Sequence, residues 1–155
     1  MGEVITRRGA VCGPSLSASV TYEGADAGEP GENVIASARD FTAGFLAAAP
    51  AVGGGEVSRD RVDLARLVVS ELVTNAVRHA PGPCRLLLEL FEDALDISVF
   101  DGLDGAPVAR PHDPRRIGQH GVEIVVAVCE SVSVEPQRTG KRVRARLSLT
   151  DAPSP

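Results

Sequence analysis

Apolar residues recur at intervals of three and four in three stretches of the chain, which is the spacing of helices that bury one face. The first stretch covers residues 32–49. The second follows Ser58, whose hydroxyl suits a helix N-cap, and continues to residue 79 or 80, where Pro81-Gly82-Pro83 ends it. The third covers residues 117–130. The pattern therefore predicts helices in these three places.

Other stretches alternate apolar with polar residues, as strands with one buried face do. They comprise residues 16–22, 85–90, 95–99, 132–135 and 142–149. The second and third of these flank a short turn and are expected to pair as a hairpin, and the last two flank a turn at residues 138–141. Strands with one polar face fit a sheet that helices cover on one side only. We therefore expect an α+β two-layer sandwich with a mixed, largely antiparallel sheet.

The length of 155 residues fits one domain with an ordinary core. We expect an irregular N-terminus over residues 1–14, a single domain over residues 15–150 and a tail over residues 151–155. Aromatic residues make up 3% of the chain and hydrophobic residues 43%, so the core is expected to be aliphatic.

Charge and cysteine content exclude several functions. The net charge of -5 argues against a nucleic-acid-binding surface, and the basic run at residues 141–146 alternates with apolar residues like one face of a strand. Cys12, Cys84 and Cys129 are widely spaced and favour neither a disulfide framework nor a zinc site. Signal-peptide and membrane-helix patterns do not occur, so we expect a cytoplasmic protein with free thiols and no membrane partner.

The second predicted helix carries acid, amide and base groups within an apolar run. At roughly 100° per residue, Glu71, Asn75 and Arg78 fall within an arc of roughly 60° beside the apolar face. A carboxylate and a carboxamide one turn apart can hold a hydrated metal ion and place a proton acceptor beside it, which is useful for handling a nucleoside triphosphate. By themselves these residues also fit an ordinary solvated helix face.

Two further features follow along the chain. Asp101 ends an apolar strand, where its carboxylate could accept a hydrogen bond from an exocyclic amine, although Asp-Gly is also an ordinary turn. Gly118 and Gly121 flank the start of the third predicted helix, where free N–H groups favour a phosphate. His120 between them is either a phosphate donor or a surface histidine. Phosphate-loop, nucleophile-elbow and standard metal-ligand motifs do not occur.

The order of these motifs indicates a family. They are Glu71-Leu72-Val73-Thr74-Asn75-Ala76-Val77-Arg78-His79-Ala80, Val99-Phe100-Asp101 with Pro107, the loop from Gly118 to Gly121, and Ala38-Arg39-Asp40-Phe41 in the first helix. This series resembles the GHKL (Bergerat) ATP-binding fold shared by histidine kinases, gyrases and certain chaperones. Within it, residues 16–149 look most like the anti-sigma-factor serine kinase branch of bacteria, with an N-box and a first glycine box.

The resemblance implies a role for each matching residue. Asn75 would bind the Mg²⁺ that bridges the phosphates of ATP, Glu71 would act as general base on a hydroxyl nucleophile, and Asp101 would bind the adenine amino group. The other nucleotide-binding residues would be Arg78 and His79 at the rim and Gly118, His120 and Gly121 at the phosphates.

Two departures from the family pattern bear on catalysis. Residues 101–105, Asp-Gly-Leu-Asp-Gly, stand where much of the superfamily has Asp-x-Gly-x-Gly, so the glycines are out of register. Residues 118–121, Gly-Gln-His-Gly, stand where this branch often has Gly-Arg-Gly, with Arg115 and Arg116 just upstream. Both changes affect the lid and the transferred phosphate more than they affect adenine binding.

The resemblance implies an ATP- and Mg²⁺-dependent protein serine/threonine kinase. It would phosphorylate an anti-sigma-factor antagonist and sequester a sigma factor, and a homodimer is a further candidate assembly. One alternative is a catalytically weak or inactive module that binds proteins in a nucleotide-dependent way. A second alternative is a detached ATP-binding part of a histidine kinase, against which the lack of a helix with a phosphoacceptor His before residue 32 argues.

Overall fold

A computed structural model describes residues 3–7, 13–23, 32–49, 56–80, 82–103 and 119–150 of the chain. The strands are β1 (Glu3–Arg7), β2 (Leu16–Tyr22), β3 (Cys84–Leu90), β4 (Ala94–Asp101), β5 (Ser131–Pro136) and β6 (Lys141–Ser148). The helices are α1 (Glu32–Ala47), α2 (Arg59–His79) and α3 (Gln119–Val128). The helices and strands expected from periodicity are therefore confirmed to within a few residues.

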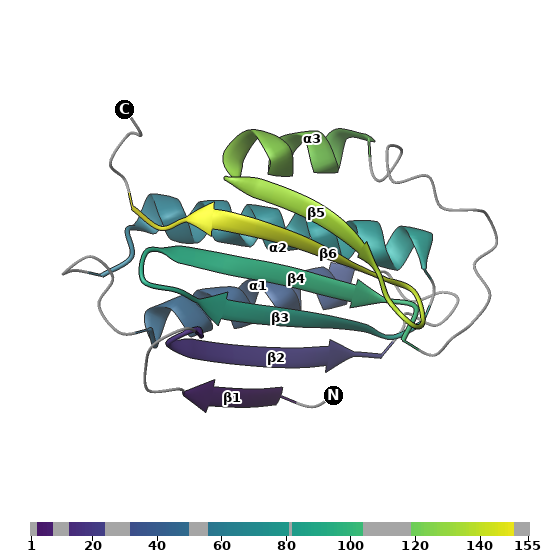
Figure 1. Ribbon diagram of the computed structural model, residues 1–155, viewed down its shortest axis with the longest axis horizontal. Helices are drawn as coiled ribbons and strands as arrows, with labels where there is room; N and C mark the ends of the chain where they lie inside the picture. Colours follow the sequence, from purple (N-terminus) through teal and green to yellow (C-terminus); the bar gives the residue numbers. More distant parts are fainter. Residues whose placement is uncertain are drawn as a thin grey trace.

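The described elements form two layers, with α1 and α2 behind a six-stranded sheet in Figure 1 and α3 above the edge strand β5, where it contacts α2 and β5. The strand order is β1-β2-β3-β4-β6-β5, and each described pair of neighbours is antiparallel. This confirms the α+β sandwich with helices on one face. Antiparallel pairing throughout the described sheet matches the strand alternation, because such sheets leave one face to solvent.

Strand β1 corrects the expectation of an irregular N-terminus. Its backbone pairs with β2 from Glu3 opposite Val20 to Arg7 opposite Leu16. The strand contains consecutive β-branched residues, which favour extended backbone. Glycines on both sides obscure this short signal in the sequence, so the expectation is wrong for residues 3–7.

Helix α2 begins and ends where its sequence signals indicate. The Ser58 hydroxyl accepts the backbone N–H of Arg61 at 3.3 Å, which satisfies one of the free donors of the first turn. Asp60 lies in the first turn and Arg78 in the last, so both charges oppose the helix dipole. The predicted cap and C-terminal end are confirmed, and they fix the position of every polar residue along the helix.

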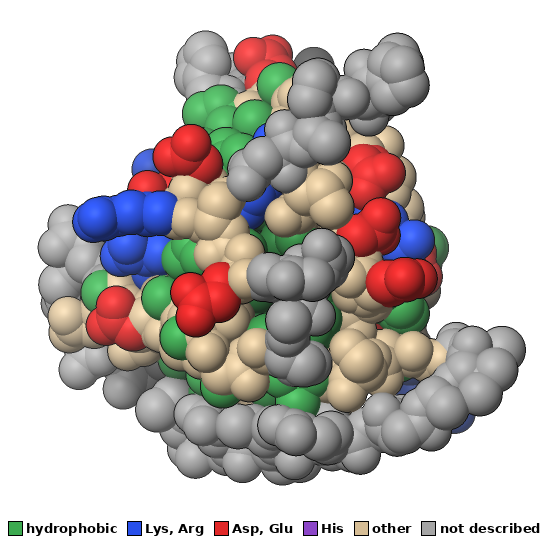
Figure 2. Space-filling view, turned by 90° about the vertical axis from the view of Figure 1, so that its left-hand side faces the viewer, with side chains coloured by type: hydrophobic (Ala, Val, Ile, Leu, Met, Phe, Trp, Pro, Cys, Tyr) green, Lys and Arg blue, Asp and Glu red, His purple; other side chains and the backbone are tan. Residues whose placement is uncertain are grey.

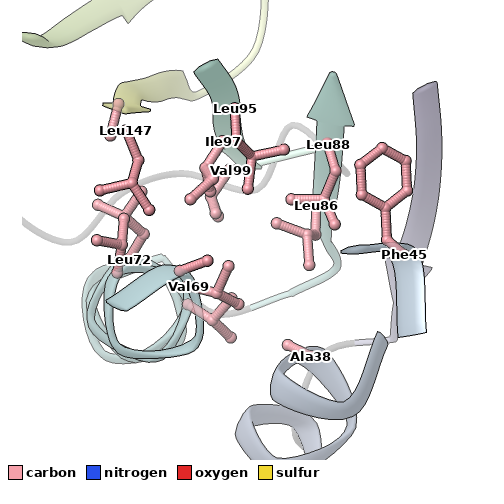
Figure 3. Close-up of a cluster of buried hydrophobic side chains, with 14 of the residues drawn as sticks. Ala38, Phe45, Val69, Leu72, Leu86, Leu88, Leu95, Ile97, Val99 and Leu147 are labelled. Carbon is pink, nitrogen blue, oxygen red and sulfur yellow. The ribbon is translucent and has the colours of Figure 1, made fainter. Parts of the chain in front are cut away.

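The core is aliphatic, as the composition predicts, and lies between α1, α2 and the central strands. Figure 3 shows buried hydrophobic side chains of this core clustered together, among them Ala38, Phe45, Val69, Leu72, Leu86, Leu88, Leu95, Ile97, Val99 and Leu147. Each large aliphatic side chain buried in this way contributes about 1.5–3 kcal/mol. Packing of this strength holds α2 in one rotational setting against the sheet, and therefore sets which of its polar residues are buried.

The sheet face away from the helices carries the arginines of β6. Arg144 Nη2 lies 2.6 Å from Asp96 Oδ2, and Arg146 Nε lies 2.7 Å from Asp96 Oδ1, while Asp96 itself is 0% exposed. Burial alone would raise the pKa of the Asp96 carboxyl, but hydrogen bonds from Arg146 and Arg144 outweigh it and hold the pKa below its ordinary value. The predicted polar face of this strand is confirmed.

The end of the molecule that contains the turn between β3 and β4 faces the viewer in Figure 2. Acidic and basic side chains are interspersed there, which is typical of a solvated surface. None of the helices in the described part of the chain is both long and apolar enough to span a bilayer.

Candidate functional site

Several of the residues singled out from the sequence lie at the opposite end of the molecule. Helix α2 ends at His79, β4 ends at Asp101 and β6 begins at Lys141. These three termini and the start of α3 all lie toward the right of Figure 1. Helix α2 also contacts β4, β6 and α3 directly. The fold therefore brings the N-box helix and the end of the Asp101 strand to one end of the sandwich.

Asn75 is a buried polar residue of α2. Only 5% of its surface is exposed, and neither Oδ1 nor Nδ2 has a hydrogen-bond partner among the described residues. Leaving a buried polar group unpaired costs about 1–3 kcal/mol, so a side chain with two such atoms points to a ligand. A carboxamide oxygen is an acceptable ligand for Mg²⁺, and the amide nitrogen can donate to a phosphate oxygen. Asn75 therefore fits a magnesium nucleotide.

The other polar residues of α2 lie closer to solvent. Glu71, one turn before Asn75, is partly exposed, and Arg78 and His79 at the end of the helix are exposed. The hydroxyl of Thr74 donates to the Ser70 carbonyl at 2.6 Å and is thus engaged within the helix. The buried amide therefore lies between a partly exposed carboxylate one turn before it and exposed basic residues at the end of the helix.

Asp101 is buried at the end of β4 and is held by Lys141. Its Oδ1 accepts the backbone N–H of Lys141 at 3.2 Å, and its Oδ2 accepts a hydrogen bond from the Lys141 ammonium. The side chains are only 4% and 10% exposed, respectively. Lys141 belongs to this site although the sequence assigned it only to a turn and a strand. Sheet register places residue 141 opposite residue 101, and no local pattern in the sequence marks this pairing of β4 with β6.

Two glycines allow β4 and the β5–β6 turn to approach closely here. Gly102 and Gly140 have φ values of 65° and 72°, which L-residues rarely adopt. A Cβ on Gly140 would lie 1.9 Å from the Asp101 carbonyl oxygen, and a Cβ on Gly102 would lie 2.6 Å from Gly140 Cα. Backbone contact of this kind fixes the Asp101–Lys141 pair in place. Gly102 therefore has a structural reason to follow Asp101 directly.

The charge of Asp101 also reaches β3. Burial raises the pKa of the Cys84 thiol to about 11, and the negative charge of Asp101 adds to this shift. The thiol is buried and neutral at ordinary pH, so it contributes no nucleophile to the site. Cys84 remains a free thiol, as expected, and so does Cys129.

The loop from Gly118 to Gly121, which is expected at the phosphates, is described only in part. Gly118 lies outside the described residues, as do Arg115 and Arg116. His120 and Gly121 fall in the first turn of α3, which begins at Gln119. Helix α3 packs against α2, so its N-terminal end lies toward the same end of the molecule as Asn75. The roles expected of Gly118, His120 and Gly121 stay predictions.

The donor set suits magnesium better than a metal that needs a complete protein cage. No group of three or more His, Cys, Asp or Glu side chains within the described ranges is placed to hold a metal ion. Mg²⁺ is usually held by one or two protein oxygens together with substrate phosphates and waters. Asn75, with Glu71 one turn away, matches that requirement.

Comparison with known proteins agrees with this arrangement. A search of curated proteins found no match. The family model described as the histidine kinase-like ATPase domain matches residues 32–147, from the start of α1 almost to the end of β6. The matched region includes α2, the end of β4 and the start of α3, and it covers more than half of the chain. The chain therefore belongs to the histidine kinase-like ATPase domain family.

Proposed function

We propose that this protein binds Mg-ATP at the end of the sandwich formed by α2, β4 and α3, and phosphorylates a serine or threonine of an anti-sigma-factor antagonist. In its other state it sequesters a sigma factor. Family membership supports an ATP-binding regulatory role. The observation that carries the proposal is the buried Asn75 amide, which lacks a partner among the described residues and lies one turn from Glu71.

Each described residue has a defined task in this proposal. The Asn75 amide oxygen is a magnesium ligand, and Asp101 offers its carboxylate to the base. Magnesium supplies charge neutralisation on the phosphates when it is bound. Glu71 accepts the proton of the attacking hydroxyl, a task for which its partial exposure is suitable because the hydroxyl belongs to a second protein. Arg78, exposed in the last turn of α2, would lie at the rim of the nucleotide site.

The proposed kinase activity is tested by measuring phosphate transfer from labelled ATP to the antagonist encoded by a neighbouring gene. Glu71→Gln should lower the transfer rate by at least about 100-fold, the usual contribution of a general base, and should leave ATP affinity nearly unchanged. Glu92→Gln is the matched control, because Glu92 is an exposed glutamate in the β3–β4 turn at the far end of the molecule. Equal transfer by wild type and Glu71→Gln would refute the assigned role.

A nucleotide-dependent module without kinase activity is the second candidate. The observation that favours it is the engagement of Asp101 by Lys141, together with the displaced glycines after Asp101. ATP would then set the conformation for partner binding without being consumed. Tight ATP binding with neither hydrolysis nor transfer to the antagonist would support the module and contradict the kinase.

A further inference from the structure

The Asp101–Lys141 pair offers a hydrogen-bond acceptor and a hydrogen-bond donor at one place. The Asp101 carboxylate accepts from the Lys141 backbone on Oδ1 and from its ammonium on Oδ2. A carboxylate has further acceptor positions, and an ammonium that uses one N–H has two left. A ligand at this point would therefore meet an acceptor that is already partly satisfied and a donor beside it.

This pairing is built into the fold. Asp101 and Lys141 are register partners on β4 and β6, and both side chains are buried on the face of the sheet that packs against the helices. The positive φ of Gly102 and Gly140 lets the two backbones approach to a distance that no Cβ would permit. The ion pair persists when a ligand arrives, because moving either charge away would leave the other buried and unpaired.

An aspartate alone would select a base by its exocyclic amine. The adenine amino group only donates, so a free carboxylate favours it strongly over a base with an oxygen at the same position. The Lys141 ammonium changes this balance, because it can donate to a carbonyl oxygen while the carboxylate accepts from a ring N–H. The pair therefore matches a 6-oxopurine as well as a 6-aminopurine.

We propose that Lys141 is a specificity-determining residue, which relaxes the selection for a 6-amino group and lets the site take 6-oxopurine nucleoside triphosphates alongside ATP. This inference rests on the proposed nucleotide site. It concerns the base alone and leaves the phosphate-binding residues of α2 unchanged.

Titration calorimetry with Mg-ATP and with Mg-inosine triphosphate tests the proposal, since the two ligands differ in the 6-position of the base and in the N1 proton. Wild type should bind both with Kd values within about tenfold of each other. Lys141→Met should shift the ratio toward ATP by at least about tenfold, the effect of one charged hydrogen bond. Arg142→Met is the matched control. It removes a neighbouring cation that hydrogen-bonds Ser98 at 2.9 Å, and its position alternates with Lys141 along β6, so the ratio should not change.

The outcomes distinguish the role of Lys141 from the existence of the nucleotide site. An unchanged ratio in Lys141→Met, or an equal loss of affinity for both nucleotides, would overturn the role of Lys141 and leave the nucleotide site standing. Absence of binding of either nucleotide by wild type would overturn the proposed function and this inference together. Circular dichroism reports whether Lys141→Met folds. Lys141→Gln removes the charge and keeps a polar end, and it should shift the ratio in the same direction. If Lys141→Met does not fold, Lys141→Gln is used in its place.

Discussion

Replacement of Asn75 by leucine should stabilise the nucleotide-free protein. The amide is 5% exposed, and neither of its polar atoms has a hydrogen-bond partner in the described part of the chain. Leucine has a similar shape and no polar atoms, and it forms helix better than asparagine. Leu72, one turn before Asn75 on the buried side of α2, is apolar and can contact the new side chain.

The magnitude follows from the two unpaired atoms. Each costs about 1–3 kcal/mol when it is buried without a partner. Imperfect packing of the new side chain offsets up to about 1.5 kcal/mol of this gain in stability. A net gain of about 2 kcal/mol in the free energy of unfolding is therefore expected, which corresponds to a rise in Tm of about 4–8 °C for a domain of this size.

Urea unfolding and thermal melts of the nucleotide-free proteins measure this gain. Asn33→Leu is the matched control, because Asn33 is exposed on α1. This substitution makes the same chemical change without removing buried polar atoms. Its stability should change by less than about 0.5 kcal/mol. A loss of stability in Asn75→Leu, or a gain no larger than that of the control, would refute the view that the Asn75 amide is kept at a cost for a ligand.

Three further predictions concern other parts of the fold. Asp96→Ala should cost about 2 kcal/mol at pH 7. The cost should shrink progressively as the pH falls from about 4 through the lowered pKa of the folded state, because the ion pairs with Arg144 and Arg146 stabilise the fold only while the carboxyl is ionised; urea unfolding against pH checks this. Gly140→Ala should destabilise the fold by more than about 2 kcal/mol through its Cβ contact with Asp101, whereas Gly44→Ala in α1, with open space around it, should raise the Tm slightly. Partial burial and the charge of Glu130 raise the pKa of Cys129 to about 11. In a Cys12→Ser variant, Cys129 should therefore react with thiol reagents far more slowly at pH 8 than an exposed cysteine does, and rapid labelling would contradict the raised pKa.

The sequence predicted the layers of the fold well, because periodicity depends on which face of an element is buried. Alternation in the strands and the three- and four-residue spacing in α2 both follow from contact with one core. Strand β1 was missed because it has only five residues and glycines lie on both sides of it, so it carries too little pattern by itself.

The candidate site was predicted in part. The helical arc placed Asn75 beside Glu71 and Arg78, but only packing shows that Asn75 is buried while Arg78 is exposed. The partner of Asp101 could not be predicted from local pattern, because Lys141 is 40 residues away and reaches it through sheet register. That register also brings the backbones of Gly102 and Gly140 into close contact.

Calorimetric titration of Mg-ATP into wild type, Asn75→Leu and Asn33→Leu tests the central claim most directly. The account predicts saturable binding to wild type and Asn33→Leu, and loss of that binding in Asn75→Leu although this variant is the more stable protein. Undiminished binding by Asn75→Leu, or no binding by wild type, would contradict the assignment of the nucleotide site to the C-terminal end of α2.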